Sequence, residues 1–304
     1  MTFPLLRLPL LASIEVIKNT DVKYLLFLTQ LSTRAKTLVK LSKVQIVLTV
    51  FQSSVQFQKL AHQEMVERLE LFFPSENPTE NPFKPPCQQK SDTKNQYQIE
   101  AYKEVLDFFL EFFKVYSVSF ELETVSSDTS LCFMEYAKGL GLKFSTARVE
   151  LDGSNGEVCQ SLLKVCSSVP QLLVLFDTEQ NFTFQGFNEY RTRYFRIAPR
   201  ERGLNWFTVD HMCALVNCSK VSVEELNWSN EDYNRFLKFW MASGGNLKSC
   251  TFYSYRANII PWVVLNGINN TQIRPHTYEI QRVDGVKAEV ALSYSTCTLK
   301  VIDA

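Results

Sequence analysis

The hydrophobic positions at the start of the chain follow helical spacing in two short segments with a polar break between them. Residues 11–18 and 21–31 place apolar side chains three and four positions apart, a spacing typical of amphipathic helices. The break falls at Asn19-Thr20-Asp21, and Thr20 is expected to cap the second helix through its hydroxyl. Helices this short cannot build a core of their own, so the pattern predicts that a partner covers part of their apolar surface.

After residue 42 the hydrophobic pattern changes to the period of a strand. Lys43–Leu60 alternates in two runs separated by Gln52-Ser53-Ser54, which predicts a β-hairpin. Leu60–Phe73 has a mixed pattern that is compatible with a helix. Five of the 11 prolines lie between Pro74 and Pro86, and a polar run follows, so residues 74–96 are predicted to form a disordered linker.

From Tyr97 onward, helix-like and strand-like segments alternate. The strand-like segments recur at intervals of 25 to 29 residues, with centres at Phe120, Val149 and Val174 and again at Val223 and Phe252. This alternation predicts a β-α repeat with parallel strands and right-handed crossovers. Two architectures satisfy it equally well: an irregular leucine-rich-repeat-like solenoid and a non-repetitive α/β sheet.

Asn230–Ser243 is the most clearly delimited helix of the chain. Ser229 stands at its N-cap position, Asp232 stands where a capping box needs an acceptor, and Gly244-Gly245 ends the helix. Its large apolar residues keep to one helical stripe, which predicts that this helix packs on the core.

The last part of the chain returns to alternation. Asp284-Gly285 lies between the alternating halves of Tyr278–Leu292, a strong hairpin signal, and Thr298–Ile302 adds one more strand. The predicted fold class is therefore α+β/α/β, in which three N-terminal helices precede a β-α repeat, leucine-rich-repeat-like domain that ends in antiparallel strands. The expected divisions are 1–42 for the helices, 43–73 for the hairpin and connecting segment, 74–96 for the linker and 97–304 for the α/β domain.

Composition narrows the class of function. Lysine plus arginine equals aspartate plus glutamate at 32 each, which argues against a nucleic-acid or acidic-membrane binder. No apolar stretch reaches 18 residues, and Arg7 and Glu15 interrupt the N-terminal run, so a signal peptide is disfavoured. Eight cysteines without a C-x-x-C pair favour reduced thiols in the cytoplasm or nucleus, and no metal or other cofactor is expected.

Catalytic chemistry has one weak candidate. Asp210-His211 could pair a base with a carboxylate, but no serine or cysteine nucleophile stands at a recognised spacing from it. Phosphate-binding glycine loops and zinc-hydrolase motifs are absent from the sequence. We therefore expect a protein that is not an enzyme and keep a hydrolase as a disfavoured alternative.

The segment Phe182–Arg202 is the candidate recognition surface within the α/β domain. It interleaves aromatic and arginine side chains, the types that dominate protein–protein hot spots. The residues expected to bind substrate are Tyr190, Arg191, Arg193, Tyr194 and Arg196. The alternative is an ordinary strand in which the aromatic side chains face the core and the arginines are solvated.

The N-terminal pattern resembles an F-box. Leu8-Pro9 opens it, apolar residues mark its two helices, and Ser32–Leu38 closes it, although Glu15 and Asp21 depart from the usual acidic and proline positions. The resemblance implies that these helices bind a Skp-type adaptor. The expected adaptor-binding residues are Leu5, Leu8, Pro9, Ile14, Val16, Ile17, Leu25, Leu28 and Leu31. An ordinary helical start to a globular domain remains the alternative.

Phe236–Leu247 and the closing hairpin at Ile280–Gly285 resemble the type 2 F-box-associated domain of the large nematode F-box family. Membership implies the substrate-recognition subunit of a Skp–cullin–F-box ubiquitin ligase, joined to cullin through the adaptor and holding an unknown protein substrate with its C-terminal domain. A rival hypothesis is an interaction scaffold that does not assemble into a ligase.

Overall fold

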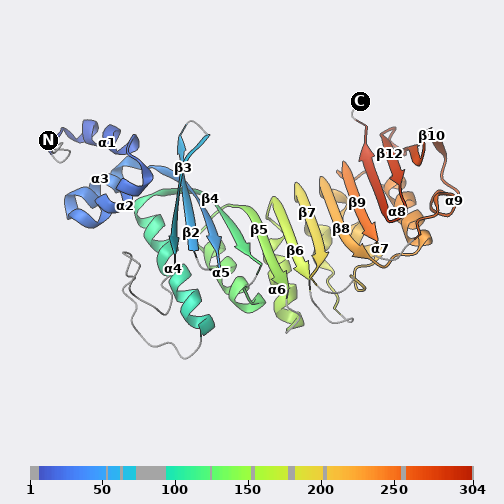
Figure 1. Ribbon diagram of the computed structural model, residues 1–304, viewed down its shortest axis with the longest axis horizontal. Helices are drawn as coiled ribbons and strands as arrows, with labels where there is room; N and C mark the ends of the chain where they lie inside the picture. Colours follow the sequence, from blue (N-terminus) through green and yellow to red (C-terminus); the bar gives the residue numbers. More distant parts are fainter. Residues whose placement is uncertain are drawn as a thin grey trace. The chain divides into compact units, whose positions relative to one another are not determined.

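The computed structural model describes residues 7–52, 54–61, 64–72, 94–123, 125–151, 155–176, 182–200, 204–254 and 258–302 (Figure 1). At residues 22, 61, 64–72 and 94–98 only the backbone is described. The chain divides into two compact units: Met1–Leu122 with Asp128–Ser145, and Glu123–Ser127 with Thr146–Ala304. The expected boundary at residue 97 lies inside the first unit, because the strand that follows it pairs with the N-terminal hairpin. Most of the expected linker, residues 74–93, lies outside the described residues.

Unit 1 begins with three helices, α1 (Leu10–Lys18), α2 (Val22–Leu31) and α3 (Thr33–Ser42). The two helices predicted from the spacing are confirmed, but the expected cap by Thr20 is wrong. The Thr20 hydroxyl donates to the Val16 carbonyl at 2.8 Å, and Asp21 takes the N-cap position of α2. Thr20 therefore helps to end α1 and does not begin α2.

A small sheet follows in unit 1, made by β1 (Gln45–Phe51), β2 (Ser54–Ala61), β3 (Glu64–Phe72) and β4 (Lys114–Leu122) in the order β4-β1-β2-β3. The predicted hairpin is confirmed by the antiparallel pairing of β1 with β2. The expectation of a helix at Leu60–Phe73 is wrong, because β3 extends this hairpin by pairing with β2.

Two helices complete unit 1, α4 (Lys94–Phe112) and α5 (Ser127–Gly139). The core between them and the sheet is aromatic: the Phe57 and Phe109 ring centroids lie 4.8 Å apart, and those of Phe120 and Phe133 lie 5.3 Å apart. These rings are buried, so the phenylalanine-rich stretch before β4 serves to cover this sheet.

Unit 2 is built on a nine-stranded sheet in the order β10-β11-β12-β13-β9-β8-β7-β6-β5. Its parallel strands are β5 (Phe144–Leu151), β6 (Gln171–Phe176), β7 (Tyr194–Pro199), β8 (Lys220–Leu226) and β9 (Ser249–Ser254). The connecting helices are α6 (Gly156–Cys166), the 3₁₀ turn η2 (Gly186–Glu189), α7 (Val209–Ala214) with the 3₁₀ turn η3 (Leu215–Asn217), and α8 (Asn230–Ala242).

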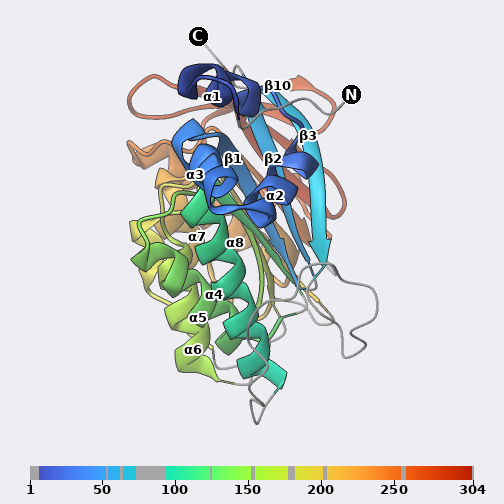
Figure 2. The same ribbon diagram turned by 90° about the vertical axis from the view of Figure 1, so that its left-hand side faces the viewer.

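These connections differ from one to the next: helices of 11 and 13 residues follow β5 and β8, the 3₁₀ turn η2 follows β6, and the six-residue helix α7 with η3 follows β7. The mixed α/β class and the parallel pairing are confirmed, but the connections do not form a regular leucine-rich-repeat array. In Figure 2 the labelled helices α6, α7 and α8 lie along one face of the strands. The other face of the unit 2 sheet, which we call the open face, carries the half-buried and exposed positions of each strand.

The C-terminal part of unit 2 is antiparallel. Helix α9 (Pro261–Val264) precedes β10 (Asn270–Arg274), β11 (Thr277–Gln281), β12 (Lys287–Leu292) and β13 (Thr296–Val301), and β13 pairs with β9. The predicted turn at Asp284-Gly285 connects β11 to β12, and Gly285 has a φ of 90°, which suits glycine.

The capping box at the N-terminus of α8 allows a local test of the fold. The Asp232 amide donates to Ser229 Oγ at 3.2 Å, and the Ser229 amide donates to Asp232 Oδ2 at 2.9 Å. Ser229→Ala is expected to lower the free energy of unfolding by about 1 kcal/mol. All four tryptophans lie in unit 2, so urea unfolding followed by their fluorescence reports on this unit. Ser161→Ala, at an exposed position of α6, is the control; an equal loss in both variants would contradict the assignment.

Candidate functional site

Helix α2 carries apolar side chains on two sides. Leu25 and Leu26 are 0 % and 6 % exposed and fill the space between the three helices, together with the buried Thr29. On the other side Tyr24, Phe27 and Leu31 are 53 %, 59 % and 54 % exposed. We call these three residues the α2 outer stripe. They follow one another at helical spacing and therefore form one continuous face of the helix.

The expected adaptor-binding residues differ in how far the structure exposes them to solvent. Ile17 and Leu25 are both 0 % exposed, so their side chains are closed inside the helical segment and cannot form a docking surface in this arrangement. Pro9 and Leu31 are exposed. The half-buried members are Leu8, Ile14, Val16 and Leu28, whereas Leu5 lies outside the described residues.

The burial of Leu25 has a physical cause. Ala35, Leu38 and Val39 of α3 are buried, and α3 packs against α2. The expected adaptor-binding residues include Leu25 on the inner side of α2 and Leu31 of the α2 outer stripe, but not Tyr24 or Phe27. The available signal was that α2 is apolar on both sides, a pattern of a helix that is covered all round. Other exposed apolar residues that were missed are Leu10, Leu11 and Leu41.

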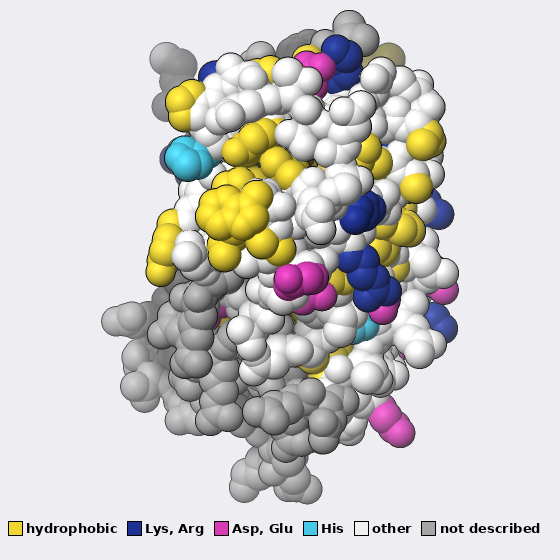
Figure 3. All heavy atoms as spheres, turned by 90° about the vertical axis from the view of Figure 1, so that its right-hand side faces the viewer, with side chains coloured by type: hydrophobic (Ala, Val, Ile, Leu, Met, Phe, Trp, Pro, Cys, Tyr) yellow, Lys and Arg dark blue, Asp and Glu magenta, His cyan; other side chains and the backbone are white. Residues whose placement is uncertain are grey.

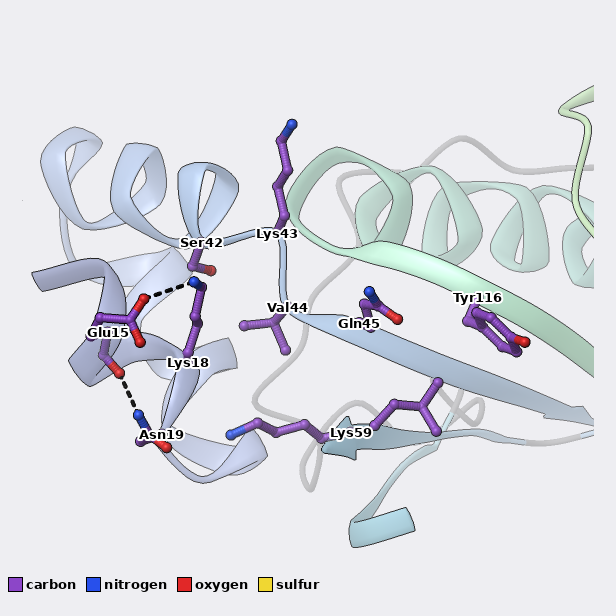
Figure 4. A pocket seen from close by; sticks show the side chains of 10 residues that line it. Glu15, Lys18, Asn19, Ser42, Lys43, Val44, Gln45, Lys59 and Tyr116 are labelled. Carbon is purple, nitrogen blue, oxygen red and sulfur yellow. Dashed lines mark hydrogen bonds and ion pairs between the residues drawn. The ribbon is translucent and has the colours of Figure 1, made fainter. Parts of the chain in front are cut away.

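A cavity of about 750 Å³ lies in unit 1 where the helices meet the sheet (Figure 4). Its polar groups bind one another: Lys18 Nζ lies 2.8 Å from Glu15 Oε1, and Lys59 Nζ of β2 donates to the Thr20 carbonyl at 3.0 Å. The Asn19 side chain also donates to the Glu15 carbonyl at 2.8 Å. These contacts attach the end of α1 to β2, so we assign the cavity a structural role.

The aromatic side chains before β7 are buried, although they lie in coil and in η2 and not in a strand as the alternative above expected. Phe182, Phe184 and Phe187 are buried, and Tyr190 is 0 % exposed. The Tyr190 hydroxyl donates to the Leu163 carbonyl at 2.7 Å, and burial raises the pKa of this phenol well above its ordinary value. Tyr190 therefore anchors the segment to α6 and cannot contact a substrate in this arrangement.

The other four expected substrate-binding residues reach the surface. Arg191 and Arg193 are exposed before β7, and Arg191 donates to the carbonyls of Asn188 and Tyr190 at 2.7 and 2.8 Å. Tyr194 and Arg196 are half-buried on the open face of the sheet. The predicted substrate-binding group therefore combines one buried residue, Tyr190, with four residues that reach the surface.

The open face carries paired charges beside Tyr194. Arg196 Nη2 lies 2.7 Å from Glu224 Oε1 on β8, and Lys220 Nζ lies 5.5 Å from the centre of the Tyr194 ring. Arg200 pairs with Glu150, whose side chain is 9 % exposed. Unpaired burial of such a carboxylate would be costly, so this arginine supports the end of β5.

Asp210 and His211 each have a polar partner elsewhere in the chain. Asp210 lies 2.5 Å from Arg235 Nη2 of α8, and the Thr208 amide donates to His211 Nδ1 at 3.1 Å, which caps α7. Burial lowers the pKa of His211, an effect that the Asp210 charge opposes. Burial also raises the pKa of the nearby Cys213 thiol to about 11, which leaves it in the unreactive thiol form. Both residues of the dipeptide therefore have structural partners.

Two further classes of site were sought in the part of the chain that the structure describes. Within it, no three His, Cys, Asp or Glu side chains gather as metal ligands. Across the same residues, no helix combines the length and apolar character needed to cross a bilayer.

The C-terminal part of unit 2 exposes large apolar side chains that the sequence analysis did not single out. Trp262 of α9 is 77 % exposed, Ile273 of β10 is 41 % exposed, and Tyr294 before β13 is 73 % exposed. In Figure 3, which views the molecule from the right-hand side of Figure 1, hydrophobic side chains gather on the face toward the viewer. Exposed apolar groups of this kind are typical of interaction surfaces.

Comparison with known proteins relates unit 2 to a family. Residues 180–252, from the segment before η2 to β9, match the F-box associated family. The chain is 24 % identical over 329 residues to the Skn-1 dependent zygotic transcript 15 protein of Caenorhabditis elegans, which covers 95 % of this chain and 94 % of that protein. No solved structure matches the chain. The similarity supports the predicted resemblance to a nematode F-box-associated domain, and the family match at residues 180–252 does not include the N-terminal helices.

The environment of His211 predicts a pH dependence. Its pKa is lowered in the folded protein, so the unfolded chain binds the proton more readily and stability falls as pH drops below about 6.5. His211→Gln keeps an acceptor for the Thr208 amide and removes the titration. Between about pH 7 and pH 5 its unfolding free energy is expected to fall less than that of the wild type. The control is His276→Gln, at an exposed position; equal pH profiles for His211→Gln and wild type would contradict the prediction.

Truncating a side chain on the inner side of α2 is expected to cost far more stability than truncating one on the outer side. Leu25→Ala is expected to destabilise the helices by about 2–5 kcal/mol because it opens a cavity in their core. Phe27→Ala removes an exposed ring and is expected to change stability by less than about 0.5 kcal/mol. Amide hydrogen exchange over residues 10–42 measures both. Similar effects of the two variants would show that the assignment of inner and outer sides is wrong.

Proposed function

We propose that this protein is the substrate-recognition subunit of a Skp–cullin–F-box ubiquitin ligase. In this proposal α1–α3 dock on a Skp-type adaptor, which links the chain to cullin, and unit 2 holds a protein substrate. The protein itself positions the substrate for ubiquitin transfer and carries no catalytic group of its own. The proposal places it in the cytoplasm or nucleus.

The observation that carries the proposal is the α2 outer stripe. Two aromatic residues and a leucine are more than half exposed on one helix face while the opposite face is filled by the chain's own helices. Aromatic side chains at the centre of an interface supply much of its binding energy. An uncovered stripe on a small helical segment is what docking to another helical protein requires.

The match of residues 180–252 to the F-box associated family supports the second half of the proposal. The family's description, F-box associated, links such a domain with an F-box, and the helical segment precedes the domain in this chain. The open face of unit 2 offers Tyr194 and Arg196 to a partner. The combination favours a receptor with one docking surface for the adaptor and another for a substrate.

Binding to a purified Skp-type adaptor tests the proposal. Phe27→Asp places a charge in the α2 outer stripe and is expected to weaken adaptor binding at least about tenfold in calorimetry. Phe239→Asp is the matched control, because Phe239 of α8 is also exposed, at 40 %, and lies in unit 2. The control is expected to bind like the wild type.

Two outcomes would contradict the proposal. If the wild-type chain does not bind the adaptor, the alternative of an interaction scaffold outside any ligase is favoured. If Phe27→Asp binds like the wild type, the adaptor docks elsewhere than on the α2 outer stripe. Unchanged hydrogen exchange of α1–α3 in Phe27→Asp establishes that the helices remain folded.

A further inference from the structure

Strand register in unit 2 brings together four residues that are distant in sequence. Lys220 of β8 and Lys300 of β13 both lie opposite Ser249 of β9, and the Lys220 ammonium lies 5.5 Å from the centre of the Tyr194 ring of β7. Residues opposite one another in a ladder point to the same face of a sheet. The neighbouring residues Val221, Cys250 and Leu299 are buried on the helix-covered side. We call the set Tyr194, Lys220, Ser249 and Lys300 the open-face row.

The carboxylates of the open face already have cationic partners. Glu224 pairs with Arg196, and Glu150 pairs with Arg200. Glu289 of β12 lies opposite Lys300 in the ladder and 2.7 Å from Arg274, and Glu279 of β11 lies 2.7 Å from Lys287. Glu225 lies at the other end of β8 from Lys220. The acidic groups near the open-face row are therefore neutralised.

The two lysines of the row are not neutralised in this way. Both are exposed, and neither forms an ion pair within the part of the chain that the structure describes. Two more cations lie at the same end of the strands. Arg193 and Lys248 are exposed immediately before β7 and β9, and their amides bond to the Pro170 and Ser219 carbonyls. This end of the open face therefore has uncompensated positive charge, although the whole chain is neutral.

The next row on the same face is flat and hydroxyl-rich. Ser222, Thr251 and Thr298 lie opposite one another on β8, β9 and β13, with Arg196 at the end of the row. Small side chains leave room for another chain to lie on the sheet, and their hydroxyls can donate to carboxylates. The two lysines are separated by two strand spacings, about 10 Å, which an extended peptide spans in about three residues.

We propose that the open-face row binds an acidic, extended segment of a partner protein. The carboxylates of that segment pair with Lys220 and Lys300, the Tyr194 ring packs beside it, and Arg193 and Lys248 extend the positive field along the strand ends. If the proposed function holds, this partner protein is the substrate, and only that identification rests on the proposed function. The charge pattern of the open-face row does not depend on adaptor binding.

A peptide-binding experiment tests the proposal. A fluorescein-labelled poly-glutamate peptide is titrated with the full chain at low salt and read by fluorescence anisotropy. Lys220→Glu with Lys300→Glu is expected to weaken binding about tenfold or more. Added salt is expected to weaken wild-type binding, because the pairs are exposed and screened. The matched control is Lys164→Glu with Lys238→Glu, on the exposed surfaces of α6 and α8, and is expected to bind like the wild type.

The outcomes separate this proposal from the adaptor proposal. Absence of wild-type binding, equal binding of a poly-lysine peptide, or an equal loss in both double variants would overturn it. Adaptor binding is measured on the same variants. The open-face double variant is expected to keep adaptor binding, and Phe27→Asp is expected to keep peptide binding, so failure of one surface is distinguishable from failure of the other.

Discussion

In a segment of three short helices, the neighbouring helices can cover only one side of α2. This constraint determines which side chains of the N-terminal part are exposed. The core of α1–α3 takes up Ile17, Leu25 and Leu38. The segment is too small to wrap α2 completely, so its second apolar side stays at the surface. A large uncovered apolar stripe is unfavourable in water, and a partner that covers it gains the free energy of burying it.

The sheet of unit 2 is likewise covered by its own chain on one side only. Its helices cover one face, where Tyr190, Phe195 and Trp240 are buried. The open face carries charged pairs, hydroxyls, the half-buried Tyr194 and the half-buried leucines of β6. Because β-strands present alternate residues to alternate faces, the same strands that build the core also arrange this surface. In the proposed function, adaptor docking and substrate binding are therefore assigned to different parts of the chain.

Local periodicity was enough to predict most elements. The helices at α1, α2 and α8 and the hairpins at β1–β2 and β11–β12 follow from spacing and turn residues that lie within a few positions of each other. Strand β3 was missed because its pairing with β2, and not its own mixed pattern, determines its structure. The irregular leucine-rich-repeat-like solenoid is not confirmed, because the connections vary from strand to strand.

The surfaces were harder to predict than the elements. Leu25 and Phe27 are both apolar residues of one helix, and only packing against α3 decides which is buried. Lys220 and Lys300 are brought together by strand register, which the sequence alone does not determine. Tyr190 and Tyr194 look alike in the sequence, yet one is a buried anchor and the other lies on the open face.

The central claim is that the exposed side of α2 is a docking surface. Amide hydrogen exchange of the full chain, measured with and without a saturating purified Skp-type adaptor, tests it most directly. The account predicts slower exchange across residues 22–31 in the complex and little change in α8. Binding that leaves the exchange of α2 unchanged, or that protects another part of the chain instead, would contradict it.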